Sequence, residues 1–282
     1  MMNMRKINFI FIFYLSLLCF LLHLLTLGTK FAPSEFVTTA LIIYSLFAFI
    51  LWHSYLRMGW KNALIFLFLG IISIFLIHYL AVSSFILSFK SFDFKNFFQI
   101  FDQRFNYSLK LGISFLNVPI SILFLWLSVI YISYEVSEHI SNFKFPKKFI
   151  WSNRLLLSFF SALLGSLISI AWFISLDPLA VRLNWWRIIL PGSYFWFLSM
   201  SFLPIFIFKL FFEKEKIKKE NLFEFAPTIA LFLLMMNNLL LALELKAPIF
   251  ALFIFILLFP YILILILRYL KAKLNLPSEF EI

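Results

Sequence analysis

Long apolar runs follow one another along the chain, and short segments that carry most of the charge separate them. The runs lie at about 7–27, 36–56, 63–86, 111–134, 155–176, 193–212, 225–243 and 249–267. Each run can cross roughly 30 Å of hydrocarbon as an α-helix. The pattern predicts one integral membrane domain over residues 1–282, an all-α polytopic transmembrane helical bundle of about eight helices (seven or eight).

Composition agrees with the pattern, because 63% of the residues are hydrophobic, only 13% are charged and the mean hydropathy is +1.00. A soluble domain has roughly a quarter of its residues charged. The net charge of +11 would suggest nucleic acid on a soluble protein. Here the cations lie between apolar runs, where they set topology and contact anionic lipid heads. We therefore expect membrane lipid as a partner and no nucleic acid.

The lysines and arginines also predict the topology. With the N-terminus inside, 16 of the 24 fall on cytoplasmic segments and 8 on the outer side. This bias predicts that both termini are cytoplasmic and that the first run is an uncleaved helix. The segment 87–110 departs from the rule with four cations and many aromatic residues on the outer side, which predicts an interfacial or re-entrant element.

Asp177, followed by Pro178, is the first candidate for chemistry, because polar groups at the edge of apolar spans are costly. Arg182, Trp185 and Trp186 follow closely. One interpretation is a helix stop at the membrane surface, where Asp177 pairs with Arg182 and the tryptophans form an aromatic belt. The other is a carboxyl group that apolar surroundings keep protonated, able to deliver a proton.

A second polar group lies before or inside the fourth run and comprises Arg104, Tyr107, Lys110 and Asn117. Under the predicted topology it shares the outer face with Asp177, so the two could form one pocket. His78 lies deep in the third run, where it either bonds a neighbouring carbonyl or acts as a ligand or proton relay.

The other polar residues within the apolar runs suggest a structural role, and the sequence lacks motifs for metal or cofactor binding. Asn237 and Asn238 lie in the middle of the seventh run, where amides hold helices together. No histidines and carboxylates have the spacing of metal ligands, and Cys19 is the only cysteine, so we expect no metal site. No glycine-rich phosphate loop or nucleophile elbow is present, and we expect no cofactor.

Three blocks in the same order resemble the membrane-bound carotenoid biosynthesis protein family, whose characterised members are carotenoid hydratases of the bacterioruberin type. The blocks are His53-Ser54 with Met58-Gly59-Trp60-Lys61-Asn62-Ala63-Leu64, then Arg104-Phe105-Asn106-Tyr107-Ser108 with Leu111-Gly112 and Asn117-Val118-Pro119, then Ala171-Trp172 through Asp177-Pro178 to Trp185-Trp186. Together they cover about residues 50 to 200. The resemblance implies a multi-pass protein of the bacterial or archaeal cytoplasmic (inner) membrane.

The chain also departs from the family pattern at positions that matter. Members carry a second aspartate four residues before the Asp-Pro pair, where this chain has Phe173. A glutamate expected in the third helix corresponds to His78. An acidic partner of Asp177 has therefore been lost.

The resemblance implies addition of water across the terminal 1,2 double bond of an acyclic carotenoid, an apolar polyene substrate. Asp177 would be the catalytic acid. The substrate-binding residues would be Tyr107, Trp185, Trp186, Arg182, Asn117, Arg104 and His78. Aromatic rings could stabilise the cation that protonation creates, by roughly 0.5–2 kcal/mol each. Arg182 paired directly with Asp177 would defeat the acid role, which requires Arg182 to turn outward toward lipid heads. Two alternatives stay open: a non-catalytic membrane protein that binds lipid or pigment, and a small transporter.

Overall fold

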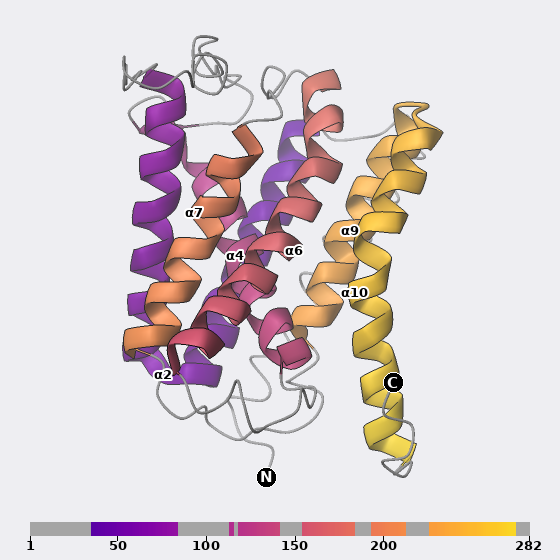
Figure 1. Cartoon of the computed structure of the whole chain (residues 1–282). Coiled ribbons are helices and arrows are strands. Elements are labelled where there is room, and N and C mark those ends of the chain that lie inside the picture. The colour runs from indigo at the N-terminus through magenta and orange to yellow at the C-terminus, as the bar shows by residue number, and fades with distance from the viewer. Residues whose placement is uncertain are drawn as a thin grey trace, which may run out of the picture.

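The structure is a computed structural model that describes residues 35–83, 113–115, 118–141, 154–183, 193–212 and 226–274. This part of the chain is helical apart from two short strands and the turns (Figure 1). The predicted helix at 7–27 and the segment 87–110 lie outside the described residues. The helices are α2 (Glu35–Ser83), α4 (Ile120–Ser141), α6 (Arg154–Arg182), α7 (Ser193–Ile207) with η3 (Phe208–Phe212), α9 (Ala226–Glu244) and α10 (Pro248–Leu274).

Helix α2 contains two arms that meet at Gly59, which has φ 78° and ψ 161°. Only glycine adopts this backbone region readily. The ring of Tyr131 lies 5.6 Å from His53, before the turn, and 5.7 Å from Phe66, after it. The arms therefore run side by side in opposite directions, as the predicted helices at 36–56 and 63–86 require. The turn lies at the bottom of Figure 1.

Helix α4 begins later and ends later than the predicted helix at 111–134. Strands β1 (Ser114–Phe115) and β2 (Val118–Pro119) form an antiparallel pair just before Ile120. Pro119 explains this start, because a proline disfavours helical geometry in the residue before it. At the other end the helix continues to Ser141, and every residue in 125–138 is buried.

Helix α6 continues through Pro178 to Arg182, so the predicted stop at Asp177-Pro178 is wrong. A proline inside a helix removes one backbone hydrogen bond and is tolerated in membrane helices that pack against neighbours. The consequence is that Asp177 lies inside a helix rather than in a loop.

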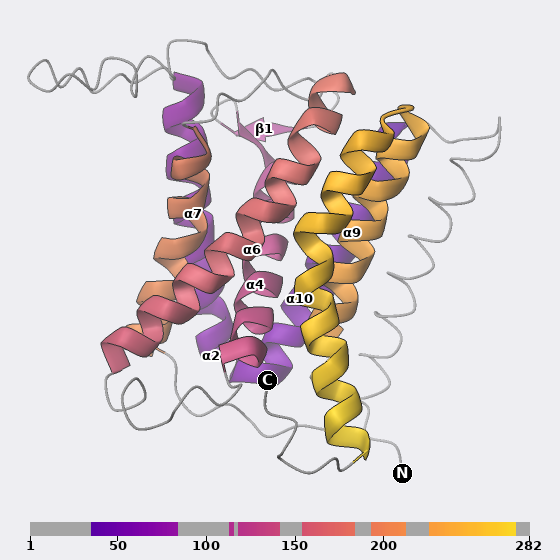
Figure 2. The ribbon, with the colours of Figure 1, turned by 45° about the vertical axis from the view of Figure 1, so that its right-hand side comes forward.

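Helix α7 passes into η3, a π-helical turn, without a break. Pro204 cannot donate to the carbonyl of Met200, four residues earlier, and the Ser73 hydroxyl donates to that carbonyl instead at 2.9 Å. The two arms of α2 and helices α4, α6 and α7 form one body. The hairpin of α9 and α10, which turns at Lys246 with φ 52°, packs beside α6 (Figure 2).

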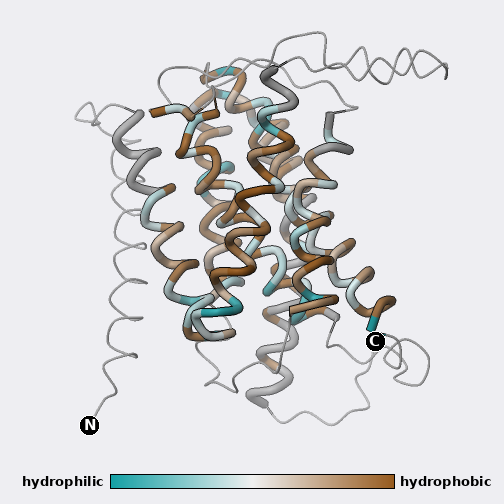
Figure 3. The backbone as a smooth tube through the Cα atoms, turned by 90° about the vertical axis from the view of Figure 1, so that its left-hand side faces the viewer, coloured by the Kyte–Doolittle hydropathy of each residue, from teal (hydrophilic) through white to brown (hydrophobic). Residues whose placement is uncertain are grey.

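Close packing in the bundle depends on two glycines. A Cβ atom at Gly70 would lie 2.4 Å from a Leu127 methyl carbon, and one at Gly165 would lie 2.9 Å from Cδ1 of Ile205. Most of each helix is hydrophobic, and the most hydrophilic stretches lie toward the helix ends (Figure 3). Large apolar side chains such as Phe68 (63% exposed) and Leu252 (61%) point outward. That is the arrangement expected of surfaces that face lipid.

Candidate functional site

Asp177 lies in α6 near the end of the bundle opposite the α2 turn. Its side chain is 5% exposed, and the hydroxyl of Tyr194, from the start of α7, donates to Oδ2 at 3.0 Å. Because Pro178 leaves the helix continuous, α6 carries the carboxyl group against α7. Asp177 is therefore a buried carboxyl with a phenol as one of its hydrogen-bond partners.

Arg182 does not form the surface ion pair with Asp177 that one interpretation of the sequence predicted. Its Nη1 donates to the carbonyl of Leu245 at 3.2 Å, and its guanidinium lies 5.5 Å from the ring centre of Phe250. Both partners belong to the α9–α10 turn and the helix that follows. The guanidinium is thus turned toward the hairpin and is not paired with Asp177.

A group of rings, which we call the aromatic cluster, packs beside Asp177. Its members are Trp126, Trp172, Phe173, Tyr194 and Phe197. The ring of Phe173 lies 4.5 Å from Phe197, 4.8 Å from Trp126 and 5.9 Å from Tyr194. Trp126 and Phe197 stack at 5.4 Å with an angle of 9° between their planes. Phe173 and Asp177 are four residues apart on α6, so they lie on the same face of that helix.

His78 reaches the same cluster from the second arm of α2. Its ring is 5.4 Å from Phe197 and 6.2 Å from Trp126, and the residue is 2% exposed. Of the predicted site residues, the structure thus brings Asp177 and His78 to the aromatic cluster. It turns Arg182 toward the α9–α10 hairpin. The remaining predicted residues lie outside the described part of the chain: Arg104, Tyr107, Asn117, Trp185 and Trp186.

Between Phe173 and Asp177, α6 makes a polar contact with α9 through Ser175. Asn238 of α9 donates to the Ser175 hydroxyl at 2.8 Å, which confirms that this amide joins two helices. Within the described residues, Asn238 Oδ1 and Trp172 Nε1 are buried and have no hydrogen-bond partner. The contact belongs to the α6–α9 interface.

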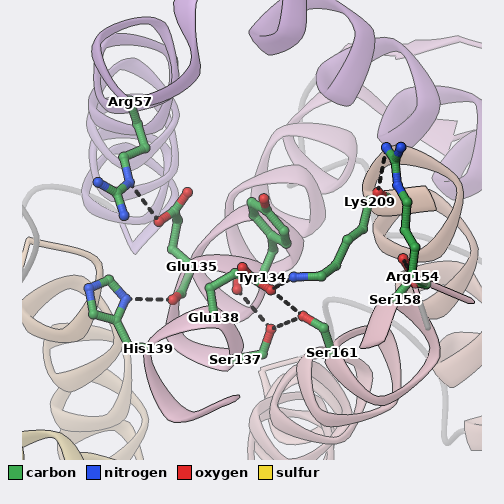
Figure 4. Close-up of polar contacts among 10 residues, drawn as sticks. All are labelled: Arg57, Tyr134, Glu135, Ser137, Glu138, His139, Arg154, Ser158, Ser161 and Lys209. Atoms are coloured by element: carbon green, nitrogen blue, oxygen red, sulfur yellow. Dashed lines mark hydrogen bonds and ion pairs between the residues drawn. The ribbon is translucent and has the colours of Figure 1, made fainter. Parts of the chain in front are cut away.

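The opposite end of the bundle holds a second polar group that the sequence did not predict (Figure 4). We call it the ion-pair cluster, and it comprises Arg57, Glu135, Glu138, Ser161 and Lys209. Glu135 is fully buried, Glu138 is 7% exposed and Lys209 is 5% exposed. Buried ions inside a membrane bundle are expensive and require partners.

Helices α2 and α4 join through two polar contacts one turn apart. Arg57 Nε lies 3.5 Å from Oε2 of Glu135, and His53 Nδ1 lies 2.5 Å from the Tyr131 hydroxyl. His53 and Arg57 are four residues apart on α2, as Tyr131 and Glu135 are on α4. The spacing places each pair on one helix face, so the two faces match.

The second ion pair joins α4 to η3. The Lys209 ammonium donates to Oε1 of Glu138, and the Ser161 hydroxyl of α6 donates to the same oxygen at 2.5 Å. Ser137 lies 3.3 Å from Ser161, oxygen to oxygen, and Arg154 donates to the backbone carbonyl of Lys209 at 3.5 Å. One carboxylate therefore connects α4, α6 and η3.

The sequence contained a signal for this cluster. Tyr131, Tyr134, Glu135 and Glu138 recur at spacings of three and four, which puts them on one side of a helix. The predicted helix ended at residue 134, so the two glutamates fell in a connecting segment. Lys209 was counted among the cytoplasmic cations, and the structure shows it buried.

Metal binding receives no support from the described residues, which contain no group of three or more histidine, cysteine, aspartate or glutamate side chains placed to hold an ion. Their chemistry is that of carboxyl groups, phenols and aromatic rings.

The described part of the chain contains four helices long and apolar enough to cross a membrane: Ile43–Tyr79, Ile120–Ile140, Arg154–Arg182 and Ala226–Leu243. They indicate a multi-pass α-helical membrane protein. No protein family model, curated protein or solved structure matches this chain.

Proposed function

We propose that this protein hydrates the terminal 1,2 double bond of an acyclic carotenoid, with Asp177 as the acid. The observation that carries the proposal is the setting of Asp177. Its carboxyl group is buried, accepts a hydrogen bond from Tyr194 and lies on the face of α6 that carries Phe173 of the aromatic cluster. Hydration of an alkene needs an acid that can donate a proton at an apolar site.

The proposed reaction uses one proton and returns it. The Asp177 carboxylic acid donates its proton to one carbon of the double bond, which leaves a tertiary cation on the other. Water adds to the cation, and the resulting oxonium loses a proton to the Asp177 carboxylate. The product is a tertiary alcohol, and the acid is regenerated without a cofactor.

Tyr194 has a specific part in this scheme. A protonated carboxyl group has one O–H donor and one carbonyl acceptor. Because the Tyr194 hydroxyl donates to Oδ2, the scheme assigns the proton for the substrate to Oδ1. The rings of Trp126, Phe173 and Phe197 would stabilise the developing cation through their faces, by roughly 0.5–2 kcal/mol each.

One observation favours a second candidate, a non-catalytic membrane protein that binds lipid or pigment. Phe173 stands where the resemblance implies a second acid, and its ring is 2% exposed and packed between Trp126 and Phe197. A scaffold that has replaced one acid by a packed ring could keep the polyene and lose the chemistry.

Pigment analysis separates the two functions. The full chain is expressed in cells that make lycopene, and the pigments are analysed by mass spectrometry for a product heavier by one water. Hydrated product from the wild type and its loss in Asp177→Asn support the hydratase. Well-expressed wild type with no hydrated product removes the hydratase, and lycopene that co-purifies with it then supports the binding protein. Ser158→Ala, at the far end of α6, is the control for expression.

A further inference from the structure

Helix α7 and η3 form one rod that connects the aromatic cluster to the ion-pair cluster. Tyr194 lies at one end and Lys209 at the other, 15 residues apart. At 1.5 Å per residue the rod is about 22 Å long. Each end makes a directional polar contact: Tyr194 with Asp177 and Lys209 with Glu138.

The Lys209 end is held from two sides. Glu138 of α4 accepts from the Lys209 ammonium and from the Ser161 hydroxyl of α6, and Arg154 of α6 donates to the Lys209 carbonyl. η3 is a π-helical turn, and such turns are rare and often found at functional sites. The ion pair thus ties this end of the rod to both neighbouring helices.

The middle of the rod is held mainly by apolar packing. Met200, Ile205 and Phe208 are fully buried, and the Ser73 hydroxyl of α2 donates to the Met200 carbonyl. Apolar burial has no preferred direction, whereas an ion pair holds two specific groups together. The ion pair therefore adds, at the charged end, a directional contact that resists movement of α7 along its axis.

The contact at Tyr194 is sensitive to that position. Its length of 3.0 Å is near the optimum, and hydrogen bonds are lost beyond about 3.5 Å. A slip of one residue moves a helix by about 1.5 Å. We infer that the Glu138–Lys209 ion pair is a positioning contact, which sets the axial position of α7 and so keeps the Tyr194 hydroxyl on Asp177. The inference rests on the proposed function for the role of Asp177.

Infrared difference spectroscopy of the purified full chain tests the inference without measuring activity. The spectrum of each protein minus that of the same protein carrying Asp177→Asn isolates the carboxyl band of Asp177. Tyr194→Phe gives the band position after loss of the hydrogen bond. The double variant Glu138→Met with Lys209→Met removes the ion pair without leaving a buried charge, and we expect it to move the Asp177 band in the same direction as Tyr194→Phe.

The chain supplies a matched control in Arg57 and Glu135. This second ion pair also uses a carboxylate of α4, but its cation comes from α2 rather than from the rod. The double variant Arg57→Met with Glu135→Met should leave the Asp177 band in place. A cooperative thermal transition, recorded for every variant, shows that each protein is folded.

Two results would overturn the inference: an unmoved Asp177 band in the folded Glu138/Lys209 double variant, or an equal shift in the Arg57/Glu135 control. The proposed function fails separately. If wild-type protein makes no hydrated product while the band moves as expected, the positioning contact stands and the hydratase does not. If the wild type makes hydrated product but the Asp177 band does not move in the Glu138/Lys209 double variant, the hydratase stands and the positioning contact does not.

Discussion

The two ends of the bundle bury acidic side chains with different partners. At one end Asp177 accepts a hydrogen bond from the neutral phenol of Tyr194, beside a group of aromatic rings. At the other end Glu138 binds the ammonium of Lys209, and Glu135 lies beside the guanidinium of Arg57. A cationic partner favours the charged carboxylate, whereas apolar surroundings favour the neutral acid. This difference in partners supports the proposal that Asp177 carries proton chemistry at the first end and that the ion pairs hold helices in place at the second.

The largest expected effect comes from breaking the ion-pair cluster. Lys209→Met leaves Glu138 buried without its ammonium partner, which costs about 3–5 kcal/mol when a buried pair is split. Adding Glu138→Met should recover most of this loss, because apolar replacement of both partners is often neutral. Unfolding of the purified proteins in detergent measures both. Equal destabilisation in the single and double variants would contradict a structural role for the charge pair.

The aromatic cluster should lose stability by cavity formation instead. Phe173→Ala removes a ring that contacts Trp126 and Phe197, and we expect a loss of about 3 kcal/mol, toward the low end for buried phenylalanine. The matched control is Phe68→Ala, whose side chain is 63% exposed and should cost little. The same unfolding measurement decides. If the two variants behave alike, the cluster is not packed as described.

A smaller effect is expected where α4, α6 and α7 meet between the two ends. Gly165→Ala places a Cβ atom 2.9 Å from Cδ1 of Ile205 and 3.4 Å from the carbonyl oxygen of Ser133. Overpacking of this kind costs about 1–3 kcal/mol. Ile205→Val removes the methyl group in the way, so the double variant should unfold nearer the wild type. Failure of that rescue would mean that the backbone contact dominates.

The smallest effect on stability is expected from Tyr194→Phe. This variant tests most sharply the difference between the Asp177 end of the bundle and the ion-pair end. Loss of one hydrogen bond costs about 1 kcal/mol. The yield of hydrated carotenoid should fall much further than the stability, because Asp177 loses the contact that orients it. Parallel measurement of unfolding and product yield tests this. A variant with unchanged yield would remove Tyr194 from the mechanism.

Much of the fold could be predicted because the beginning and length of each apolar run indicate where a helix begins and how long it is. The turn between the runs at 36–56 and 63–86 falls at Gly59, and the runs near 155, 193, 225 and 249 begin within two residues of their helices. The errors concern the late end of α4 at Ser141 and the two prolines Pro119 and Pro178. Pro178 reads as a stop, yet packing on both sides of α6 keeps the helix continuous to Arg182.

The candidate sites were predictable to different degrees. Asp177 was found because an acid after a long apolar run is conspicuous. Glu138 was missed because the predicted helix ended at residue 134. Lys209 was missed because a charge near the end of a run has the same sequence signature whether it faces water or a partner 71 positions away. The hydrogen bond of Tyr194 to Asp177 also needed the structure, because it joins residues of different helices.

The central claim is that Asp177 delivers the proton for water addition to an apolar polyene. The most direct measurement uses purified protein in lipid vesicles containing lycopene, incubated in water labelled with oxygen-18. The account predicts an alcohol product that carries the heavy oxygen with the wild type, and none with Asp177→Asn at equal protein concentration. Labelled product formed equally by Asp177→Asn would contradict it.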